Sequence, residues 1–239
     1  MVKVLIGCPT YEKYDYCVDE WLDAVKSIIE FSSENEVNAE YLLVDNSKDN
    51  KFFEKLEENG INAIKSKHYS NVKDRIVSSR NILREKVLKE NYDYFFSLEQ
   101  DVIPEKDILM KLLSHKKKIV SAYYGKQQEL AVQDKETNEI KKVKIELPIV
   151  WLKEERGVRR AFPQEVLNRG LIKVEALGIG CMLIAREVFE KIRFRHEPEK
   201  KAYDDMFFCL DAKKLGYGCF LDSDIEVKHL HKFWEKENL

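Results

Sequence analysis

The segment YDYFFSLEQDVIP, residues 92–104, carries the clearest indication of the fold. The apolar run that starts at Tyr94 is typical of a central strand covered on both faces of a sheet. Glu99 and Asp101 follow this run, and the closing proline cannot continue a strand ladder. We therefore expect both acids at the carboxyl edge of a parallel sheet, where α/β proteins bind ligands. Acids this close together can share one hard cation, although a polar strand exit without a ligand would look the same.

The composition excludes several classes of function. The 239 residues include 41 Lys and Arg and 43 Asp and Glu, a formal charge of -2, so no overall basic field attracts nucleic acid. Five cysteines without a Cys-x-x-Cys pair predict reduced, buried thiols. The chain starts directly with a strand and has no apolar run of roughly 20 residues. We expect a cytoplasmic protein without a transmembrane segment, with peripheral attachment to a membrane left open.

Apolar periodicity predicts strands and helices that alternate along the first half of the chain. Residues 2–8 form a continuous apolar strand, and residues 16–31 have the spacing of an amphipathic helix laid on a sheet. Residues 41–44 form a second strand, which ends in Asp45. A strand, helix and strand of these lengths are typical of a parallel pair. Trp21 is expected in the core rather than as a platform for a sugar ring.

The later elements follow the same rules, with one exception. Helices are predicted over residues 51–59, 72–89, 105–114 and 186–192 and from Tyr203 to Gly216, and strands over residues 61–65, 118–123 and 220–231. Residues 126–147 instead alternate like a half-exposed hairpin, with a polar turn at residues 134–138. Trp151, just beyond, could pack under this hairpin or stack on a sugar.

Three further sites carry residues with chemical potential. Arg80 starts from the inward face of its helix, where it needs an anion, either a carboxylate of the crevice or a ligand phosphate. Gly178 and Gly180 indicate a backbone that closely approaches a ligand or another strand. His229 closes a short strand after a run of acids, where it could complete a metal site, and we prefer it to His231.

Taken in order, these motifs resemble the nucleotide-sugar-dependent glycosyltransferases of the GT-A fold, in particular the family 2-like enzymes. The segments that carry the resemblance are Cys8-Pro9-Thr10-Tyr11, Asp45, Ser79-Arg80-Asn81, Leu98-Glu99-Gln100-Asp101, Gly178 to Ile184, Asp204-Asp205 with the helix that follows, and Val227-Lys228-His229. The resemblance implies an α/β GT-A (nucleotide-diphospho-sugar transferase) fold, with a mostly parallel central sheet flanked by helices and an inserted β-hairpin. It does not cover residues 126–170.

The resemblance also implies an organisation of the chain. We expect residues 1–239 to form one glycosyltransferase domain. Residues 1–125 would be its nucleotide-binding half, residues 126–170 an inserted hairpin region, and residues 171–239 the acceptor and catalytic half. The Gln-x-x-Arg-Trp sequence of processive synthases is absent from the sequence, so we expect one sugar to be added per turnover.

Roles for individual residues follow from the same resemblance. Pro9, Thr10, Tyr11, Asp45, Arg80, Glu99 and Gln100 would bind the nucleoside-diphosphate sugar. Asp101 and His229 would hold Mn²⁺ or Mg²⁺, and Glu99, which replaces the usual first acid of Asp-x-Asp, would reach the metal or the ribose. Asp205 would be the general base of an inverting reaction on a glycan, lipid-linked or other hydroxyl acceptor. Asp204 would orient that acceptor or cap the helix.

Two other functions stay open at this point. A nucleotidyltransferase of similar fold is one alternative, although the glycine-rich phosphate loop usual in such enzymes has no counterpart at Pro9-Thr10-Tyr11. A non-catalytic nucleotide-binding or glycan-binding protein is the other, although the combination of Asp101, Asp205 and His229 argues against a decayed enzyme. A glycoside hydrolase built on two carboxylates would leave Asp45 and Arg80 without a purpose.

Overall fold

The computed structural model describes residues 1–133 and 139–230. The polar turn expected at residues 134–138 and the alternative ligand His231 lie outside the described residues.

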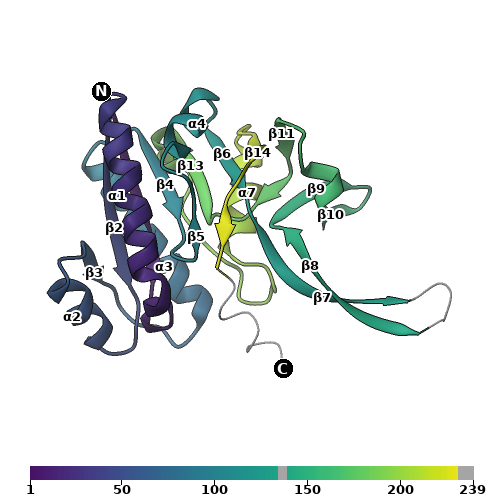
Figure 1. The fold of residues 1–239 in the computed structure, drawn as a ribbon, viewed down its shortest axis with the longest axis horizontal. Coiled ribbons are helices and arrows are strands. Elements are labelled where there is room, and N and C mark those ends of the chain that lie inside the picture. Colours follow the sequence, from purple (N-terminus) through teal and green to yellow (C-terminus); the bar gives the residue numbers. More distant parts are fainter. Residues whose placement is uncertain (134–138, 231–239) are drawn as a thin grey trace.

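An eight-stranded sheet forms the centre of the protein. Its strands are β1 (Val2–Thr10), β2 (Val37–Asp45), β3 (Ala63–Lys65), β4 (Tyr94–Leu98), β6 (Ile119–Tyr123), β11 (Leu171–Val174), β13 (Cys181–Ala185) and β14 (Cys219–Glu226). They are arranged in the order β11-β14-β6-β13-β4-β1-β2-β3 (Figure 1). β13 is antiparallel to both of its neighbours and β11 is antiparallel to β14, whereas the other pairs are parallel. The predicted α/β fold with a mostly parallel central sheet is confirmed.

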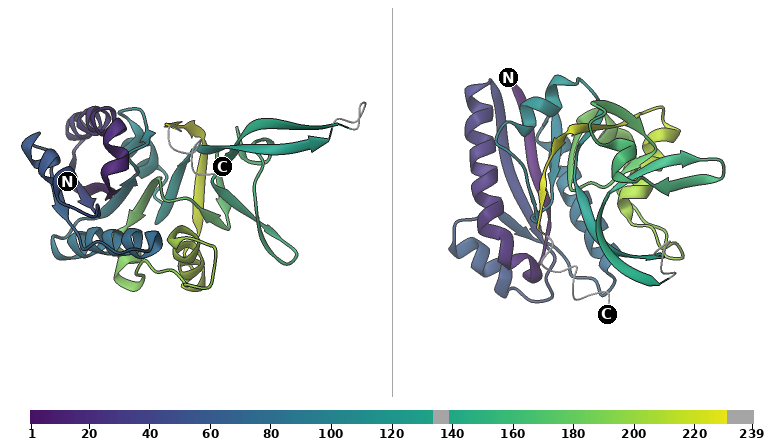
Figure 2. Two further views of the ribbon diagram at one scale, coloured as in Figure 1. Left: turned by 90° about the horizontal axis from the view of Figure 1, so that it is seen from below. Right: turned by 45° about the vertical axis from the view of Figure 1, so that its right-hand side comes forward.

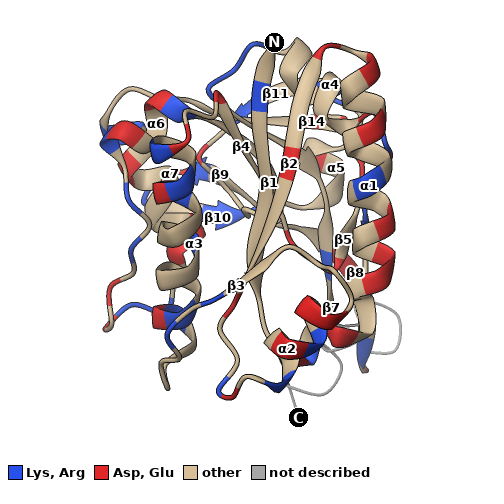
Figure 3. Ribbon diagram, turned by 90° about the vertical axis from the view of Figure 1, so that its left-hand side faces the viewer, with Lys and Arg blue, Asp and Glu red and all other residues tan. Residues whose placement is uncertain are grey.

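Helices cover both faces of this sheet (Figure 2). One face is covered by α1 (Val18–Glu34), α2 (Lys51–Glu58) and α4 (Ile108–Ser114), and the other by α3 (Val72–Lys89), α6 (Arg186–Lys191) and α7 (Asp204–Lys214). The buried apolar side chains form two clusters, one under each helical layer. The central strands carry few charged residues, whereas the outer surfaces of the helices carry many (Figure 3). Burial of the apolar side chains against both faces is therefore what holds the layers together.

β4 occupies the middle of the sheet, as its apolar sequence predicts. It pairs in parallel with β1 and antiparallel with β13. Phe95 and Phe96 are both fully buried and belong to the clusters on opposite faces, because successive side chains of a strand alternate. Trp21 of α1 is fully buried and donates from its indole nitrogen to the carbonyl of Leu98, at 3.1 Å. The core position predicted for Trp21 is thus confirmed, and this contact ties α1 to the end of β4.

Some element boundaries differ from the prediction. Residues Glu12–Cys17 form a 3-10 helix, so the α-helix begins only at Val18. The last predicted strand is divided: β14 ends at Glu226, and β15 (Lys228–His229) leaves the main sheet. β15 pairs instead with β5 (Val102–Ile103), the two-residue strand that follows Asp101. This pairing carries His229 to the end of β4, which local sequence cannot indicate.

The inserted region forms two small antiparallel sheets. β7 (Gly125–Gln133) and β8 (Ile140–Pro148) make the predicted hairpin, which projects away from the body of the protein (Figure 1). β9 (Val150–Glu154), β10 (Gly157–Arg160) and β12 (Ala176–Leu177) make a three-stranded sheet. The short helix α5 (Pro163–Val166) follows β10 along the chain. Trp151 in β9 is half-buried and packs against the core cluster beneath α3 and α7, which favours packing over sugar stacking.

Candidate functional site

A cavity of about 470 Å³ opens at the carboxyl edge of the sheet, where the ends of β1, β2 and β4 meet. Six residues predicted to form the site line it: Pro9, Tyr11, Arg80, Glu99, Gln100 and Asp101. Its volume lies within the usual range for a small-molecule site. Positive side chains that the sequence analysis did not single out, Lys13, Lys48 and Arg75, also line the cavity, together with His68. The cavity therefore offers cations for an anionic ligand beside carboxylates suited to a metal.

Asp45 and Thr10 lie behind the wall of this cavity rather than on it. Asp45 is fully buried and binds Lys65, its register partner on β3, at 2.6 Å. Its other oxygen accepts from the backbone and the hydroxyl of Ser47, at 3.0 and 2.5 Å. Thr10 donates its hydroxyl to the amide oxygen of Gln100. In this arrangement Asp45 and Thr10 hold the residues of the wall in place, and Ser47 and Gln100 face the cavity.

Arg80 connects the two halves of the site. Its side chain is almost fully buried and binds Asp204, the first residue of α7, and Glu99, the first residue after β4, each at 2.6 Å. These two carboxylates outweigh the opposing effect of burial and raise the pKa of the guanidinium. The sequence left two kinds of partner open for Arg80, a carboxylate of the crevice or a ligand phosphate. In the structure its partners are carboxylates of the crevice. Asp204 makes this ion pair and makes no cap hydrogen bond to the helix, whose N-cap residue is Tyr203.

Asp101 and His229 meet at the exit of β4. His229 Nε2 lies 3.3 Å from Asp101 Oδ2, and Nδ1 lies 2.6 Å from the carbonyl of Gly125. A proton on Nδ1 that is donated to this carbonyl leaves the Nε2 lone pair on the side of Asp101. Burial opposes a charge on His229, but the carboxylate of Asp101 outweighs it and raises the pKa of the imidazole.

These two residues are the best candidates for metal ligands. Asp101 Oδ1 is buried, and no hydrogen-bond donor among the described residues is within reach of it. An orphaned carboxylate oxygen beside an imidazole nitrogen fits a divalent cation. Glu99 turns its carboxylate to Arg80 instead, and residues 1–133 and 139–230 hold no group of three His, Cys, Asp or Glu side chains arranged for a metal. Any cation here would need further oxygens from a bound ligand.

Two carboxylates of the site, those of Glu99 and Asp205, have raised pKa values. Burial raises the pKa of Glu99 to about 7, and Asp101 adds to the effect while Arg80 opposes it. Burial together with the neighbouring Asp204 raises the pKa of Asp205 to about 6. Asp205 Oδ1 accepts from the backbone of Met206 at 2.6 Å. Burial is the main cause of both shifts, so a cation brought close to these carboxylates would favour their ionised forms.

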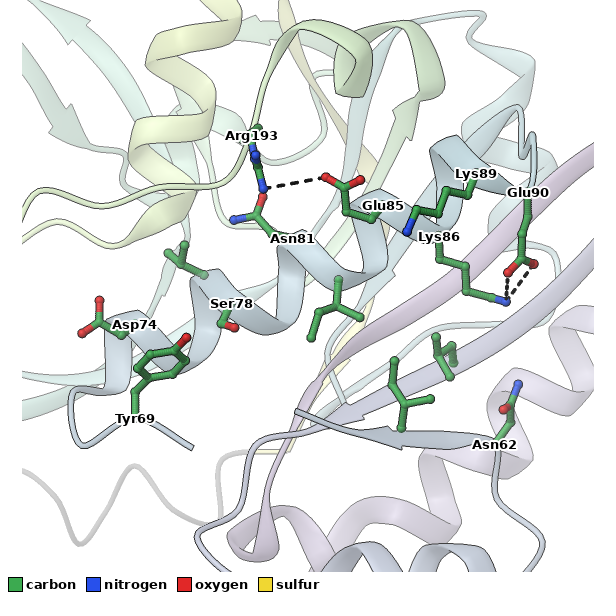
Figure 4. A pocket seen from close by; sticks show the side chains of 14 residues that line it. Asn62, Tyr69, Asp74, Ser78, Asn81, Glu85, Lys86, Lys89, Glu90 and Arg193 are labelled. Carbon is green, nitrogen blue, oxygen red and sulfur yellow. Dashed lines mark hydrogen bonds and ion pairs between the residues drawn. The ribbon is translucent and has the colours of Figure 1, made fainter. Parts of the chain in front are cut away.

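A second cavity of about 880 Å³ lies between α3 and the edge strand β3 (Figure 4). It is larger, but it contains none of the residues predicted for the site. Four of its charged side chains pair with one another: Lys86 with Glu90 at 2.7 Å, and Arg193 with Glu85 at 3.7 Å. Because those charges are already satisfied, we place the functional site at the carboxyl edge of the sheet.

Comparisons with known proteins agree with this architecture. No family model and no curated protein matches the sequence. Among solved structures, TarS 1-349 of S. aureus matches with a TM-score of 0.55 and 16% identity, over 97% of this chain and 60% of that chain. GalNAc-T7, solved with UDP, GalNAc and Mn²⁺, matches with a TM-score of 0.59 and 11% identity, over 96% of this chain and 44% of that chain. Both are GT-A glycosyltransferases.

The chain has a GT-A fold. The resemblance predicted from the motifs is thereby confirmed at the level of the fold, which is as far as identities this low extend. None of the helices in residues 1–133 and 139–230 combines the length and the apolarity needed to cross a bilayer.

Tyr124 also shapes the candidate site and was not predicted from the sequence. Tyr124, directly after β6, is buried and accepts a hydrogen bond from the backbone of Gly180 at 2.6 Å. The carbonyl of Gly180 in turn accepts from the backbone of Glu99 at 2.9 Å. A Cβ at Gly180 would lie 2.8 Å from the Tyr124 ring. The group that approaches Gly178 and Gly180 closely is therefore the Tyr124 side chain of the same protein, and not a ligand. The position of Tyr124 directly after an apolar strand was the feature of the sequence that could have indicated this.

Proposed function

We propose that the protein is a metal-dependent, inverting glycosyltransferase that moves one sugar from a nucleoside-diphosphate sugar to a hydroxyl acceptor. One observation carries the proposal. Arg80 joins Glu99 and Asp204 at 2.6 Å each, and so connects the cavity wall, which contains Arg80, Glu99 and Asp101, to the start of α7, where Asp205 follows Asp204. A leaving-group site and a base site are both needed for direct displacement.

The donor would bind in the cavity of about 470 Å³. Three cationic side chains line it and would attract the negative diphosphate: Lys13, Lys48 and Arg75. This local charge is needed because the chain as a whole has a net charge of -2 and does not attract anions. Tyr11 also lines the cavity, in edge-to-face contact with Tyr14 at 5.2 Å between ring centroids, and would pack against the nucleoside. That GalNAc-T7 was solved with UDP, GalNAc and Mn²⁺ supports this class of donor.

Asp101 and His229 would hold Mn²⁺ or Mg²⁺, and diphosphate oxygens would complete the coordination. When bound, the cation would act as a Lewis acid that neutralises the negative charge of the departing diphosphate. Gly125 keeps His229 in the required orientation through the 2.6 Å contact to Nδ1. Arg80 keeps Glu99 away from the metal pair, so Glu99 would contact the donor rather than serve as a full ligand.

Asp205 would accept the proton of the acceptor hydroxyl. The acceptor oxygen forms a bond to the anomeric carbon as the bond from that carbon to the diphosphate oxygen breaks, and the nucleoside diphosphate leaves. A direct displacement of this kind inverts the anomeric centre. A base is most effective when its pKa is near the working pH, and the pKa of about 6 at Asp205 satisfies this condition while leaving the carboxylate ionised at pH 7.

Five buried cysteines, all free thiols, support a reducing compartment and hence a cytoplasmic location as part of the proposal.

The first test is a thermal-shift screen of UDP, GDP, dTDP and CDP, each with and without Mn²⁺ or Mg²⁺. A ligand that binds only the native state raises the melting temperature. We expect a metal-dependent shift with one diphosphate, lost in Asp101→Asn and retained in the control Glu105→Gln, which changes an exposed acid nearby. Absence of a shift with any nucleotide would overturn the proposal. Release of pyrophosphate rather than a nucleoside diphosphate during turnover would assign the site to a nucleotidyltransferase.

A further inference from the structure

Arg160 lies in the small sheet that contacts α7. It is the last residue of β10 and pairs with Trp151 of β9, which pairs in turn with Ala176 of β12. The next residue, Leu177, contacts the thiol of Cys209 on α7, with 3.5 Å between its backbone nitrogen and Sγ. Cys209 is four residues after Asp205 and therefore shares its face of the helix. The small sheet thus carries Arg160 toward the turn of α7 that holds the candidate base.

The guanidinium of Arg160 is held in a fixed orientation. Nε donates to the carbonyl of Pro148 at 2.8 Å, and one terminal nitrogen donates to the carbonyl of Leu147 at 3.0 Å. The side chain is half-buried, and both carbonyl contacts come from the end of β8. An arginine oriented in this way loses little further rotamer freedom when it binds a ligand.

Arg160, like the half-buried Arg75, has no carboxylate partner among the described residues and is held by backbone carbonyls instead. Arg80, Arg84 and Arg195 each bind an acid at 2.6 to 2.8 Å. Burial lowers the pKa of Arg160, and the more distant charges of Asp205 and of two tyrosines only partly offset this effect. A guanidinium stays charged at neutral pH even so, which leaves an underneutralised cation within electrostatic range of the candidate base.

The surrounding sequence is also basic. The inserted region, residues 126–170, contains ten Lys and Arg and eight Asp and Glu, although the whole chain has a net charge of -2. The inserted region therefore has a net positive charge, whereas the rest of the chain is acidic. Such a distribution attracts an anionic partner to this side of the protein alone.

We propose that Arg160 binds an anionic group of the acceptor, a phosphate or a carboxylate, and so selects acceptors that carry negative charge near the attacking hydroxyl. This inference rests on the proposed transferase function. The fixed fork of Arg160 presents paired N–H donors to an oxyanion, which is the geometry that phosphate and carboxylate prefer. Arg160 is thereby a specificity-determining residue, and Asp205 accepts the proton.

The test observes the side chain directly by NMR of the arginine Nε–Hε groups in the full-length protein, saturated with the nucleotide and metal found in the screen. The Arg160 signal is assigned as the one lost in Arg160→Gln. Methyl phosphate and acetate serve as the two probes, because they separate a phosphate site from a carboxylate site. We expect a saturable shift of the Arg160 signal with one of them. No saturable shift with either probe at about 100 mM, where even weak single contacts are populated, would overturn the inference.

Variants extend the test to transfer. Arg156→Gln is the matched control, because Arg156 is exposed in the turn before β10 and carries the same charge. With an acceptor that carries the preferred anion, we expect Arg160→Gln to raise the acceptor KM roughly tenfold or more, with the nucleotide affinity unchanged. Arg160→Lys should recover part of this loss, and Arg156→Gln should match the wild type. An equal KM in Arg160→Gln and wild type would show that Arg160 only supports the end of β8.

The two proposals fail in distinguishable ways. Nucleotide binding without an anion response at Arg160 removes only the inference about the acceptor. An anion response at Arg160 in a protein that binds nucleotide but transfers no sugar removes the proposed glycosyltransferase.

Discussion

Asp205 and Asp211 lie on the same helix, α7, but their carboxylates have opposite surroundings. Asp205 is enclosed beside Asp204, and its pKa is raised to about 6. Asp211 accepts two hydrogen bonds from Arg195, at 2.6 and 2.9 Å, which lower its pKa. The first carboxylate holds its proton more tightly in the folded than in the unfolded chain, and the second holds it less tightly. The two residues therefore give predictions of opposite sign.

The first of these predictions concerns the pH dependence of transfer. If Asp205 is the base, kcat/KM should fall about tenfold per pH unit below the pKa of about 6. Initial rates between pH 4.5 and 8 with saturating metal would measure this limb. An acidic limb near pH 4, the ordinary range of an aspartate, would mean that a different group accepts the proton.

The free energy of unfolding gives a second measurement of the raised pKa of Asp205. Because folding raises the pKa of Asp205, its contribution to the free energy of unfolding falls as the pH rises through about 4 to 6. Asp205→Asn should therefore stabilise the protein at pH 7, by about 2 kcal/mol, while lowering transfer roughly 100-fold or more. Asp211→Asn, the control on the same helix, should lower stability and leave transfer unchanged. Urea unfolding at pH 7 tests both, and a destabilised, active Asp205→Asn would remove Asp205 from the mechanism.

At the scale of elements, a single side chain joins three of them at the site. Arg80 extends from α3, Glu99 follows β4, and Asp204 begins α7. Asp204 is 124 residues away in sequence from Arg80, yet the two atoms of their ion pair are 2.6 Å apart. Removing one member of such a buried group leaves the others unpaired and is costly. Arg80 thus ties the start of α7 to the end of β4, in addition to the core contacts of Phe208, Cys209 and Ala212.

The turn before β13 depends on a close approach of Tyr124. A methyl group at Gly180 would be 2.8 Å from atoms of this fully enclosed ring, so Gly180→Ala should cost about 1–3 kcal/mol of stability. It should also weaken nucleotide binding, because Gly180 holds the backbone of Glu99. Urea unfolding and the nucleotide thermal shift measure the two effects.

The matched control for this substitution is Gly218→Ala. Its new methyl group would meet the half-buried ring of Phe220 at 2.9 Å and the end of the exposed Lys173 side chain at 3.2 Å, both of which can move. The control should cost less than about 1 kcal/mol. Equal stability losses in the two variants would mean that the Tyr124 contact has no special role.

At the scale of the whole molecule, only the base of the projecting hairpin contacts residues of the proposed site. The base of the hairpin supplies Gly125, whose carbonyl orients His229, and the carbonyls of Leu147 and Pro148 that hold Arg160. The exposed part beyond this base, from Ile140 to Lys144 on β8, is open to solvent. A two-stranded ribbon of this kind buries little apolar surface and adds little to global stability.

This division predicts the result of a deletion. Replacing residues 129–144 with an Asn-Gly turn would join Gln128 to Ile145, which face each other in the hairpin. We expect the shortened protein to keep its melting temperature within a few degrees and to keep its metal-dependent nucleotide shift. Differential scanning fluorimetry measures both. Loss of nucleotide binding in a folded deletion protein would show that the outer hairpin contributes to the donor site.

Local sequence patterns were enough to predict the layers of this protein and the edge at which its candidate site lies. Uninterrupted apolar runs, such as the one in β4, and helical spacing, as in α1, report local burial, which depends on neighbouring residues only. The polar residues that follow such runs had to lie at the carboxyl edge. For the same reason Arg80, Glu99 and Asp101 could be placed around one crevice before their contacts were known.

Only the tertiary structure decided which of these residues meet. Asp45 lies behind the cavity wall because β3 brings Lys65 to it, and His229 reaches Asp101 because β15 pairs with β5 rather than with the main sheet. Tyr124 fills the space left by the glycines, and Arg160 is oriented by carbonyls of a strand end. Each of these contacts depends on how separate elements pack and on which buried charges come together. Local sequence patterns predict neither, because the partners are far apart in the sequence.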